Sequence, residues 1–474
     1  MLLLFTVTAL AATSQVEPGA DLSGYVNGML PGDVLELADG VYPLELGLDI
    51  VSAGTEDAPI VIRAAPGATP VLALSGSDYA IDIQGTEFIQ VKGLTLQGPP
   101  EPADGFWSGG LRVLSSRGIR IDTLTVTGFT GTGLRVEGDC RDVELVGNAV
   151  LDMPGGHGIE VGCWDASCWL ERGQIRRNWI GRLTGEGAHG VLLHHGSQDI
   201  SVADNVLAHL AFRGITAGST EYGEPNRIEG NALWEIGEHG IFVQGAARVR
   251  NNVVLTVGGS AIRTADDPAR RSLGDVVIAY NTVADSGDWT VYLEDWPDAQ
   301  GMVLSSNVIA NPFSFGLWYP DVPARDFTAN RLVANVVTGA ADLPQSRFVG
   351  AVIEGEGYDD FASFEGRDLY PAPQATMLDA GERSAESGLP PLDFNGVPRD
   401  GTAPDAGAYS YLGDGNPGWA LTEGFKALGY AEEDRTVDLG GGCCSGGDGS
   451  KAWIGLALLP LALRRRRQRV HPRQ

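Results

Sequence analysis

Short stretches of alternating hydrophobic and polar residues recur along most of the chain. Each stretch is followed by an asparagine, a second short stretch, a glycine-rich corner and a third stretch. The unit reads QIRRNWIGRLTGEGAHGVLL in one place and RIEGNALWEIGEHGIFV in another. Hydrophobic residues at every second position are typical of a β-strand with one buried face. Each unit therefore predicts three short strands separated by turns.

An asparagine occupies the same place in successive units. We expect this residue to adopt the left-handed conformation at a corner, and its amide to hydrogen-bond to the same amide in the next unit. Two earlier units fit the pattern with Gly93 and Thr123 in the column. The predicted column consists of Asn148, Asn178, Asn205, Asn231, Asn252, Asn281, Asn307 and Asn330.

One unit cannot enclose a core, whereas stacked units can. We therefore predict an all-β protein, a single-stranded right-handed parallel β-helix, with its rungs over residues 61–345. Because the ends of such a stack need cover, residues 13–60 are expected to form an N-terminal cap with an amphipathic helix at Ala20–Leu30. Residues 346–412, rich in proline, glycine and acidic residues, are expected to form a C-terminal capping segment that wraps the last coil.

Residues 1–12 are predicted to be a signal peptide, since an apolar run ends at an Ala9–Leu10–Ala11 site followed by polar residues. Export would permit disulfides. Cys163 and Cys168 lie in one short loop and are the leading candidates for a bridge, with pairing of either to Cys140 as the alternative.

The segment PGDVLELADGVYPLELGLDI, followed by GTEDAPIVIRAAPG, lies within residues 31–75. It resembles the opening segment of secreted β-helix proteins in and around the polysaccharide lyase family of chondroitinase B and alginate lyases. The resemblance implies a pectin-lyase-like fold and a polysaccharide ligand. Those lyases use a lysine base, and this chain has no lysine between Lys92 and Lys426, so their machinery is absent.

Residues 413–442 read as a linker, and residues 443–474 combine two cysteines, an apolar block and an arginine cluster. The apolar block, Ala452–Leu463, is shorter than the roughly 17–25 residues of a membrane span. The order of parts resembles the MYXO-CTERM sorting tail of myxobacteria and their relatives. The resemblance implies a secreted protein retained at the cell surface or outer envelope of a Gram-negative bacterium, attached to the membrane or envelope through this tail. The tail residues are Cys443, Cys444, Arg464, Arg465, Arg466 and Arg467.

A formal charge of −28 excludes a broad nucleic-acid interface, because phosphates would be repelled. Three histidines, with Arg213 among them, recur just before the third strand of their units: His157, His189 and His239. Imidazoles suit acid–base chemistry, so these four residues are the candidate catalytic group. The alternative is that they are selected for turn geometry.

The third strand presents a second set of residues outward by its period of two, and aromatic rings among them suit stacking on sugars. These candidate substrate-binding residues are Glu160, His194, Phe242, Gln244, Arg263, Tyr292, Glu294 and Trp318. No cofactor is expected; calcium is the one ion considered, at Asp266, Asp267, Glu294 and Asp295.

The leading functional hypothesis is a monomeric, surface-retained β-helix protein that binds extracellular or cell-wall polysaccharide. One alternative is a lyase or glycoside hydrolase that acts on uronate-containing glycans. The other is a structural or adhesive surface protein without a catalytic site.

Overall fold

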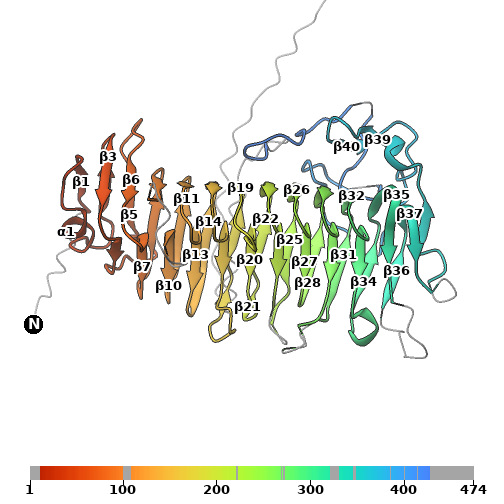
Figure 1. The fold of residues 1–474 in the computed structure, drawn as a ribbon, viewed down its shortest axis with the longest axis horizontal. Coiled ribbons are helices and arrows are strands. Elements are labelled where there is room, and N and C mark those ends of the chain that lie inside the picture. The colour runs from red at the N-terminus through yellow and green to blue at the C-terminus, as the bar shows by residue number, and fades with distance from the viewer. Residues whose placement is uncertain are drawn as a thin grey trace, which may run out of the picture. The chain divides into compact units, whose positions relative to one another are not determined.

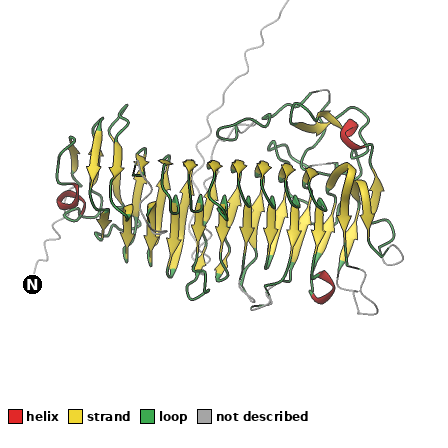
Figure 2. Cartoon of the chain, viewed as in Figure 1, coloured by secondary structure: helices red, strands yellow, loops and turns green. Residues whose placement is uncertain are grey.

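The computed structural model describes residues 11–99, 108–219, 223–267, 270, 273–320, 330–344, 348–384, 386–399, 401–413 and 415–427. Over these residues the chain is a parallel β-helix, as the repeats predicted (Figure 1). Each coil contributes three short strands, and each strand pairs in parallel with its counterpart one coil further on. Figure 2 shows how little helix accompanies the strands.

The strands form three ladders along the stack. Ladder A contains β1 (Thr13–Val16), β2 (Val34–Leu37), β5 (Ile60–Ala64), β8 (Ile89–Lys92), β11 (Arg117–Asp122), β14 (Cys140–Val146), β18 (Gln174–Arg176), β22 (Ser201–Ala203), β25 (Asn226–Glu229), β28 (Ala247–Arg250), β31 (Val276–Ala279), β34 (Val303–Ser305) and β36 (Arg331–Val333). Two short strands, β17 (Leu170–Glu171) and β21 (Ser197–Gln198), extend it at one edge.

Ladder B contains β3 (Val41–Leu44), β6 (Val71–Leu74), β9 (Thr95–Gln97), β12 (Thr125–Thr127), β15 (Ala149–Met153), β19 (Trp179–Leu183), β23 (Val206–Leu210), β26 (Ala232–Ile236), β29 (Val253–Val257), β32 (Thr282–Ser286), the first part of β35 (Val308–Trp318), β37 (Asn335–Asp342) and β38 (Val352–Glu354).

Ladder C contains β4 (Leu48–Ile50), β7 (Tyr79–Gln84), β10 (Gly109–Leu114), β13 (Leu134–Glu137), β16 (Ile159–Val161), β20 (Val191–Leu193), β24 (Ile215–Ala217), β27 (Ile241–Val243), β30 (Ile262–Thr264), β33 (Val291–Leu293) and the last part of β35.

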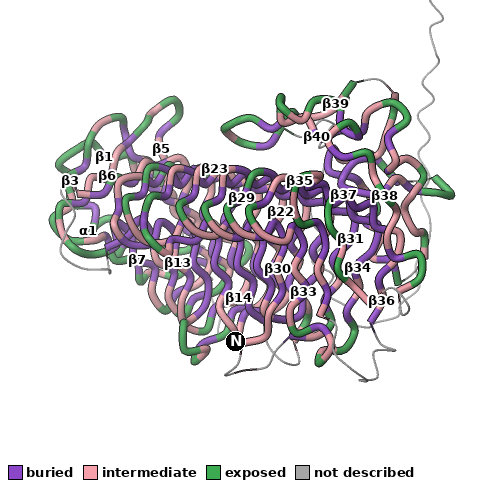
Figure 3. Tube along the Cα trace, turned by 45° about the vertical axis from the view of Figure 1, so that its right-hand side comes forward, coloured by how far each residue is buried: buried purple, intermediate pink, exposed green. Residues whose placement is uncertain are grey.

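The interior of the stack is filled by the residues that the alternation assigned inward. In β27, for example, Ile241 and Val243 are fully buried, and the same holds for Ile159 in β16. One continuous apolar cluster runs from Val16 to Val352 along the axis, and Figure 3 shows buried positions recurring along each coil. Burying each such side chain contributes about 1.5–3 kcal/mol, so stacking is the source of the stability that a single coil lacks.

The asparagine column forms an amide ladder at the corner between ladders A and B. Each Nδ2 donates to the Oδ1 of the asparagine one coil further on, at 2.9–3.0 Å. The column ends at Asn335 and not at Asn330, because Asn307 donates to Asn335. Asn330 instead donates to the carbonyl of Trp296. The inclusion of Asn330 in the column was therefore wrong.

The left-handed residue of this corner stands one position before the ladder asparagine, which corrects the conformational reason given for the asparagine. Gly93 and Thr123 have φ of 70° and 54° and occupy this preceding position, so Leu94 and Leu124 hold the column position in their coils. The same left-handed place is taken by Gly147, Arg177, Asp204, Gly230, Asn251, Tyr280, Ser306 and Ala334. The asparagines themselves are retained for their hydrogen bonds.

The N-terminal region is more regular than the sequence suggested. Helix α1 covers only Leu22–Val26, within the predicted range Ala20–Leu30, and buries Leu22 and Val26. Strand β1 already pairs with β2, and β2 with β5. The parallel ladder thus begins inside the region 13–60 that was assigned to a cap.

The C-terminal segment, residues 361–427, lies along the outer face of ladder B rather than around the last coil. It includes the antiparallel pair β39 (Phe361–Ser363) and β40 (Asp368–Pro371). Its apolar side chains and the outward residues of β23, β26, β29 and β32 form a second core that buries Trp234 and Tyr409. The described part of the predicted linker, up to residue 427, belongs to this packing, since Leu421 is buried and Lys426 pairs with Asp204.

Two of the predicted targeting segments lie largely or wholly outside the described residues: the signal peptide, of which residues 1–10 are outside, and the tail with Cys443, Cys444 and Arg464–Arg467. No helix among the described residues has the length and apolar character needed to cross a bilayer. The Cys163–Cys168 disulfide is present, and Cys140 is a buried free thiol.

Candidate functional site

The outer face of ladder C carries most of the candidate residues in three parallel columns. Strand register places the first column one residue per coil, because each member pairs directly with the next. This outward row consists of Arg135, Glu160, Leu192, Thr216, Phe242, Arg263, Tyr292 and Trp318. The second column, two residues further along the chain in each coil, includes Glu137, His194, Gln244 and Glu294. Successive members of a column are about 4.8 Å apart along the axis.

The third column is the corner column, which lies where the chain enters ladder C. Backbone hydrogen bonds between coils align it, as Gly158 N–H donates to the carbonyl of His189 and Gly214 N–H to that of His239. Its members are Thr132, His157, His189, Arg213, His239, Ser260, Trp289 and Phe315. The sequence interpretation of a repeated histidine position is thus reproduced as a spatial column beside the outward row.

A buried carboxylate organises the polar end of this face. Glu160 accepts hydrogen bonds from Thr132 Oγ1 at 2.8 Å, and its other oxygen lies 3.0 Å from His194 Nε2. Arg135 Nε approaches it at 3.8 Å. Burial alone would raise the pKa of Glu160, but the bond to His194 and the charge of Arg135 outweigh it and lower the pKa to about 2. Glu160 is therefore anionic, and its contact with Nε2 orients the ring of His194.

His157 and His189 have their protonation fixed by the fold. The backbone N–H of His189 donates to His157 Nδ1 at 3.1 Å, so a neutral His157 carries its hydrogen on Nε2. His189 Nδ1 is 2.8 Å from Thr216 Oγ1, and its ring packs edge-on against Phe212. Burial lowers the pKa of His157, and it lowers the pKa of His189 to about 3. Both are neutral, packed imidazoles rather than free proton carriers.

His239 faces hydrogen-bond donors on both ring nitrogens. The N–H of Ser260 donates to Nδ1 at 3.0 Å, and Arg263 Nη1 lies 3.1 Å from Nε2. A neutral imidazole accepts a hydrogen bond at one nitrogen. Protonation would remove that acceptor and leave both nitrogens as donors that face donors. Burial, partly opposed by Glu238, lowers the pKa of His239 to about 4. His239 contacts Arg263, whereas the histidine that contacts Glu160 is His194.

Arg213 and Arg263 are fixed by carboxylates and rings. Arg213 donates to both oxygens of Glu238, at 2.6 and 3.2 Å, and Arg263 donates to Glu294 at 2.6 and 3.2 Å. Their guanidinium carbons lie 4.5 and 5.8 Å from the ring centre of Phe242. Phe242 is therefore buried between two cations, and is not exposed as the period-two pattern suggested.

Four aromatic side chains lie in the last coils at the other end of the face, as one pair of rings in each of two columns. Tyr292 and Trp318 have ring centres 4.4 Å apart in the outward row, and Trp289 and Phe315 have ring centres 4.7 Å apart in the corner column. Phe315 is 47% exposed. We call these four residues the aromatic platform. Phe315 and Trp318 both lie on strand β35, which runs from ladder B into ladder C without a turn.

The carboxylates considered for calcium do not form one site. Asp267 Oδ2 lies 3.2 Å from His195 Nε2 and 3.1 Å from an Arg270 nitrogen, while Glu294 is bound to Arg263. Asp295 accepts from the N–H of Asp266. Over the described ranges, no group of three or more histidine, cysteine, aspartate and glutamate side chains is arranged to hold a metal ion.

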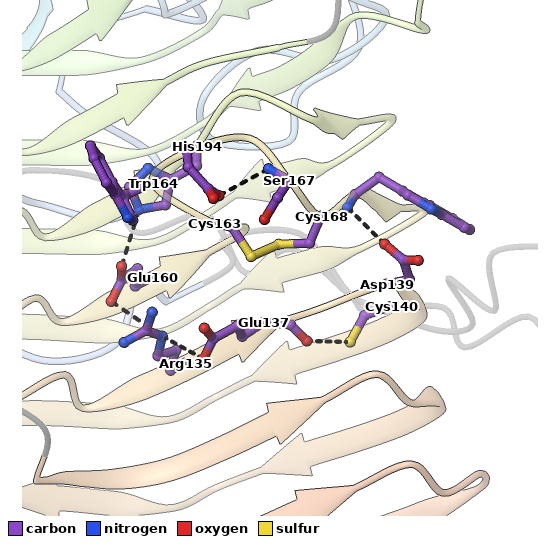
Figure 4. Close-up of a disulfide and its surroundings, with 12 residues drawn as sticks. Arg135, Glu137, Asp139, Cys140, Glu160, Cys163, Trp164, Ser167, Cys168 and His194 are labelled. Atoms are coloured by element: carbon purple, nitrogen blue, oxygen red, sulfur yellow. Dashed lines mark hydrogen bonds and ion pairs between the residues drawn. A yellow bond between two sulfur atoms is a disulfide. The ribbon is translucent and has the colours of Figure 1, made fainter.

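The disulfide loop lies beside the polar end of the face. Figure 4 shows the Cys163–Cys168 bridge near His194 and Glu160, with Trp164 directly after Cys163. Trp164 is 79% exposed, and its carbonyl accepts a hydrogen bond from Arg270. The loop is thus joined to the turn that follows β30.

Sequence reasoning placed the candidate residues on one face but did not pair them. It missed Glu238, whose place one residue before His239 is the only signal of its bond to Arg213. It also left Arg135 and Thr132 outside the candidate group, although both reach Glu160. Gln244 lies in the second column, two coils from both His194 and Glu294, and is half-buried.

No protein-family model matches the chain, and no curated protein matches it. Solved structures with a similar fold include the pectate lyase Pel9A, which is 13% identical with a TM-score of 0.50 and covers 85% of this chain and 97% of that enzyme. Another is the A-module of the mannuronan C-5 epimerase AlgE6 from Azotobacter vinelandii, 16% identical with a TM-score of 0.50, covering 68% of this chain and 91% of that module. At these identities the likeness establishes the fold. The protein is a parallel β-helix, similar in fold to a pectate lyase and to a mannuronan epimerase.

Proposed function

We propose that the protein binds a polysaccharide along the outer face of ladder C, with the glycan chain parallel to the stack. The observation that carries the proposal is the aromatic platform. Tyr292, Trp318, Trp289 and Phe315 stand in two adjacent columns in the last coils. Partly exposed rings of this kind bind the apolar faces of sugars, and their hydroxyl or indole groups supply hydrogen bonds.

The charges of the face favour a neutral chain over a polyuronate. Its arginines are matched by carboxylates, since Arg213 binds Glu238 and Arg263 binds Glu294. A uronate would have to displace a carboxylate from a guanidinium that already makes two hydrogen bonds to it. The net charge of −28 adds long-range repulsion. Uronate-containing glycans therefore remain the alternative substrate class.

A glycan array followed by titration calorimetry tests the binding proposal. Tyr292→Ala and Trp318→Ala should each weaken binding of the best ligand by about five- to thirtyfold, because each removes a ring worth ~1–2 kcal/mol. Tyr25→Ala is the matched control, since Tyr25 is a 45% exposed aromatic residue on α1. Absence of binding to any glycan would favour a structural or adhesive protein. Equal losses in all three variants would exclude the platform as the site.

A second candidate function is cleavage of the bound chain, favoured by the Glu160–His194 pair at 3.0 Å. A carboxylate that orients an imidazole is a recurrent arrangement for proton transfer. His194 would hold or release the proton, and Glu160, whose pKa is about 2, would stay charged. Assays for new reducing ends and for ultraviolet-absorbing unsaturated products distinguish hydrolysis from elimination. His194→Gln should abolish turnover and retain binding; retained turnover would refute the assignment.

Export and surface retention through the C-terminal tail complete the proposal, together with a monomeric state. The Cys–apolar–Arg order of residues 443–474 supports retention. Deleting residues 443–474 should move the protein from the cell envelope to the medium, which fractionation measures. Light scattering of the purified chain checks the monomer. Envelope retention of the shortened protein would exclude the tail as the anchor.

A further inference from the structure

A separate hollow lies where three successive coils turn from ladder C to ladder A. Its volume is about 230 Å³, and it is lined by residues of the turns before β8, β11 and β14 together with Trp169. The lining residues include Thr86 and Glu87 in the first coil, Ser115 and Ser116 with Arg117 of β11 in the second, and Asp139 with Arg141 of β14 in the third. The volume is below the roughly 300–1,000 Å³ of sites for drug-sized ligands, so the hollow suits one small ring.

We propose that this corner hollow is a second saccharide subsite, one that takes a single neutral sugar residue. Trp169 supplies an indole that is 37% exposed, with the Arg141 guanidinium 5.2 Å from its ring centre. Ser115 and Asp139 are exposed at the rim. An aromatic ring beside hydroxyl, carboxylate and guanidinium groups is the combination that binds sugar hydroxyls and sugar faces together.

The charges of the hollow exclude a strongly anionic ligand. Arg117 is paired with Glu87 at 3.0 Å, and Arg141 with Glu171 at 3.4 Å. Asp139 adds a further carboxylate, which accepts a hydrogen bond from the backbone N–H of Trp169. Two cations therefore face three anions, so phosphate, sulfate or a uronate would meet net repulsion, whereas a neutral polyol would exchange hydrogen bonds with both signs of charge.

The Cys163–Cys168 disulfide explains how the wall of this hollow is held. Trp169 directly follows Cys168, and the bridge closes a loop with a sequence separation of 5. Cross-linking at the preceding residue restricts the backbone that carries the indole. On the other side, Leu170 in β17 pairs with Cys140 in β14. The indole is thus fixed between a covalent link and a strand pair, which reduces the ordering cost of binding.

The hollow is independent of the aromatic platform. Its aromatic residue, Trp169, follows β16, and Tyr292 lies in β33, five coils further along ladder C. At about 4.8 Å per coil the separation is ~24 Å. A disaccharide cannot span that distance, so one molecule cannot contact both sites, and variants at each site separate their contributions.

Titration of the whole protein with cellobiose, maltose and N,N′-diacetylchitobiose, with digalacturonate and inorganic sulfate as anionic probes, tests the proposal. At least one neutral disaccharide should bind, with Trp169→Ala and Arg117→Gln each weakening it about tenfold or more. Trp164→Ala, on the same loop but outside the hollow, should leave that affinity unchanged. Tyr292→Ala, measured alongside, identifies any disaccharide binding that belongs to the aromatic platform. Circular dichroism checks that every variant is folded.

Four results would overturn the subsite. They are no neutral disaccharide bound, preference for digalacturonate or sulfate, equal loss in Trp164→Ala and Trp169→Ala, or dependence on Tyr292 alone. The last result would place all binding on ladder C, and would support the proposed function while refuting the second subsite.

Discussion

The amide ladder makes a quantitative prediction at Asn231, in the middle of the column. Asn231 donates to the carbonyl of Val202 and to Asn252 Oδ1, and its own Oδ1 accepts from both the backbone and the side chain of Asn205. The side chain is fully buried. Asn231→Ala removes all four hydrogen bonds. At about 1 kcal/mol each, with an added cost for the buried Asn205 N–H left unpaired, the expected loss is roughly 3–5 kcal/mol.

Asn330→Ala is the matched control, because Asn330 lies outside the ladder and makes a single amide bond to the Trp296 carbonyl. It should cost about 1 kcal/mol. Urea unfolding followed by tryptophan fluorescence and circular dichroism measures both variants against the parent chain. If Asn231→Ala costs no more than Asn330→Ala, the ladder contributes geometry and little stability, and the energetic reasoning is refuted.

Three further predictions follow from buried groups. Because burial lowers the pKa of His189 from 6.5 to about 3, the unfolded chain gains a proton in this window that the folded chain does not, so stability falls as pH falls. The loss between about pH 7 and pH 5 is ~2 kcal/mol, and His189→Gln should remove it from the urea midpoints; an unchanged pH dependence would contradict it. Lys426→Ala breaks the 2.7 Å contact with Asp204 and should cost about 2 kcal/mol, seen as faster proteolysis of residues 361–427; unchanged cleavage would contradict the docking role. Replacing Cys163 and Cys168 by serine should cost about 2 kcal/mol for this short loop, measured as a lower urea midpoint that matches the reduced parent.

The coil architecture could be predicted from the sequence because the signal is local and repeated. The alternation in IEV and VLL places Ile159, Val161, Val191 and Leu193 inside, and all four are buried. The end of the asparagine column was misassigned because two asparagines lie five residues apart, and spacing alone does not separate them. The sequence VANVV around Asn335 does match RNNVV around Asn252, so the preceding left-handed residue was the missing criterion.

The candidate site was predictable as a set of columns and not as a set of contacts. Period two and the repeat place His157, His189 and His239 in register. They do not reveal that burial keeps these imidazoles neutral, or that His194 is the histidine bound to Glu160. Such pairings depend on rotamers and on depth below the surface, which no repeat pattern records.

The docking of residues 361–427 had no local signal at all. Its apolar residues follow neither a strand nor a helix period. The segment also reaches coils far earlier in the chain, as the contact between Arg182 and Glu423, 241 residues apart, illustrates. Only the three-dimensional arrangement shows that the outward residues of ladder B need such a cover.

The docked segment, residues 361–427, also limits how many coils the β-helix can contain. It contacts the stack at three points. Glu382 pairs with Arg331, Arg399 donates a hydrogen bond to Asn251, and Lys426 pairs with Asp204. Solenoids commonly gain or lose whole repeats during evolution, because each repeat touches only its neighbours. Here, deleting one coil between Asp204 and Arg331 would shift the later coils by one step, so the segment could no longer make all three contacts. The length of this part of the β-helix is therefore set by the chain that follows it, and duplication or loss of coils should be tolerated only outside that interval.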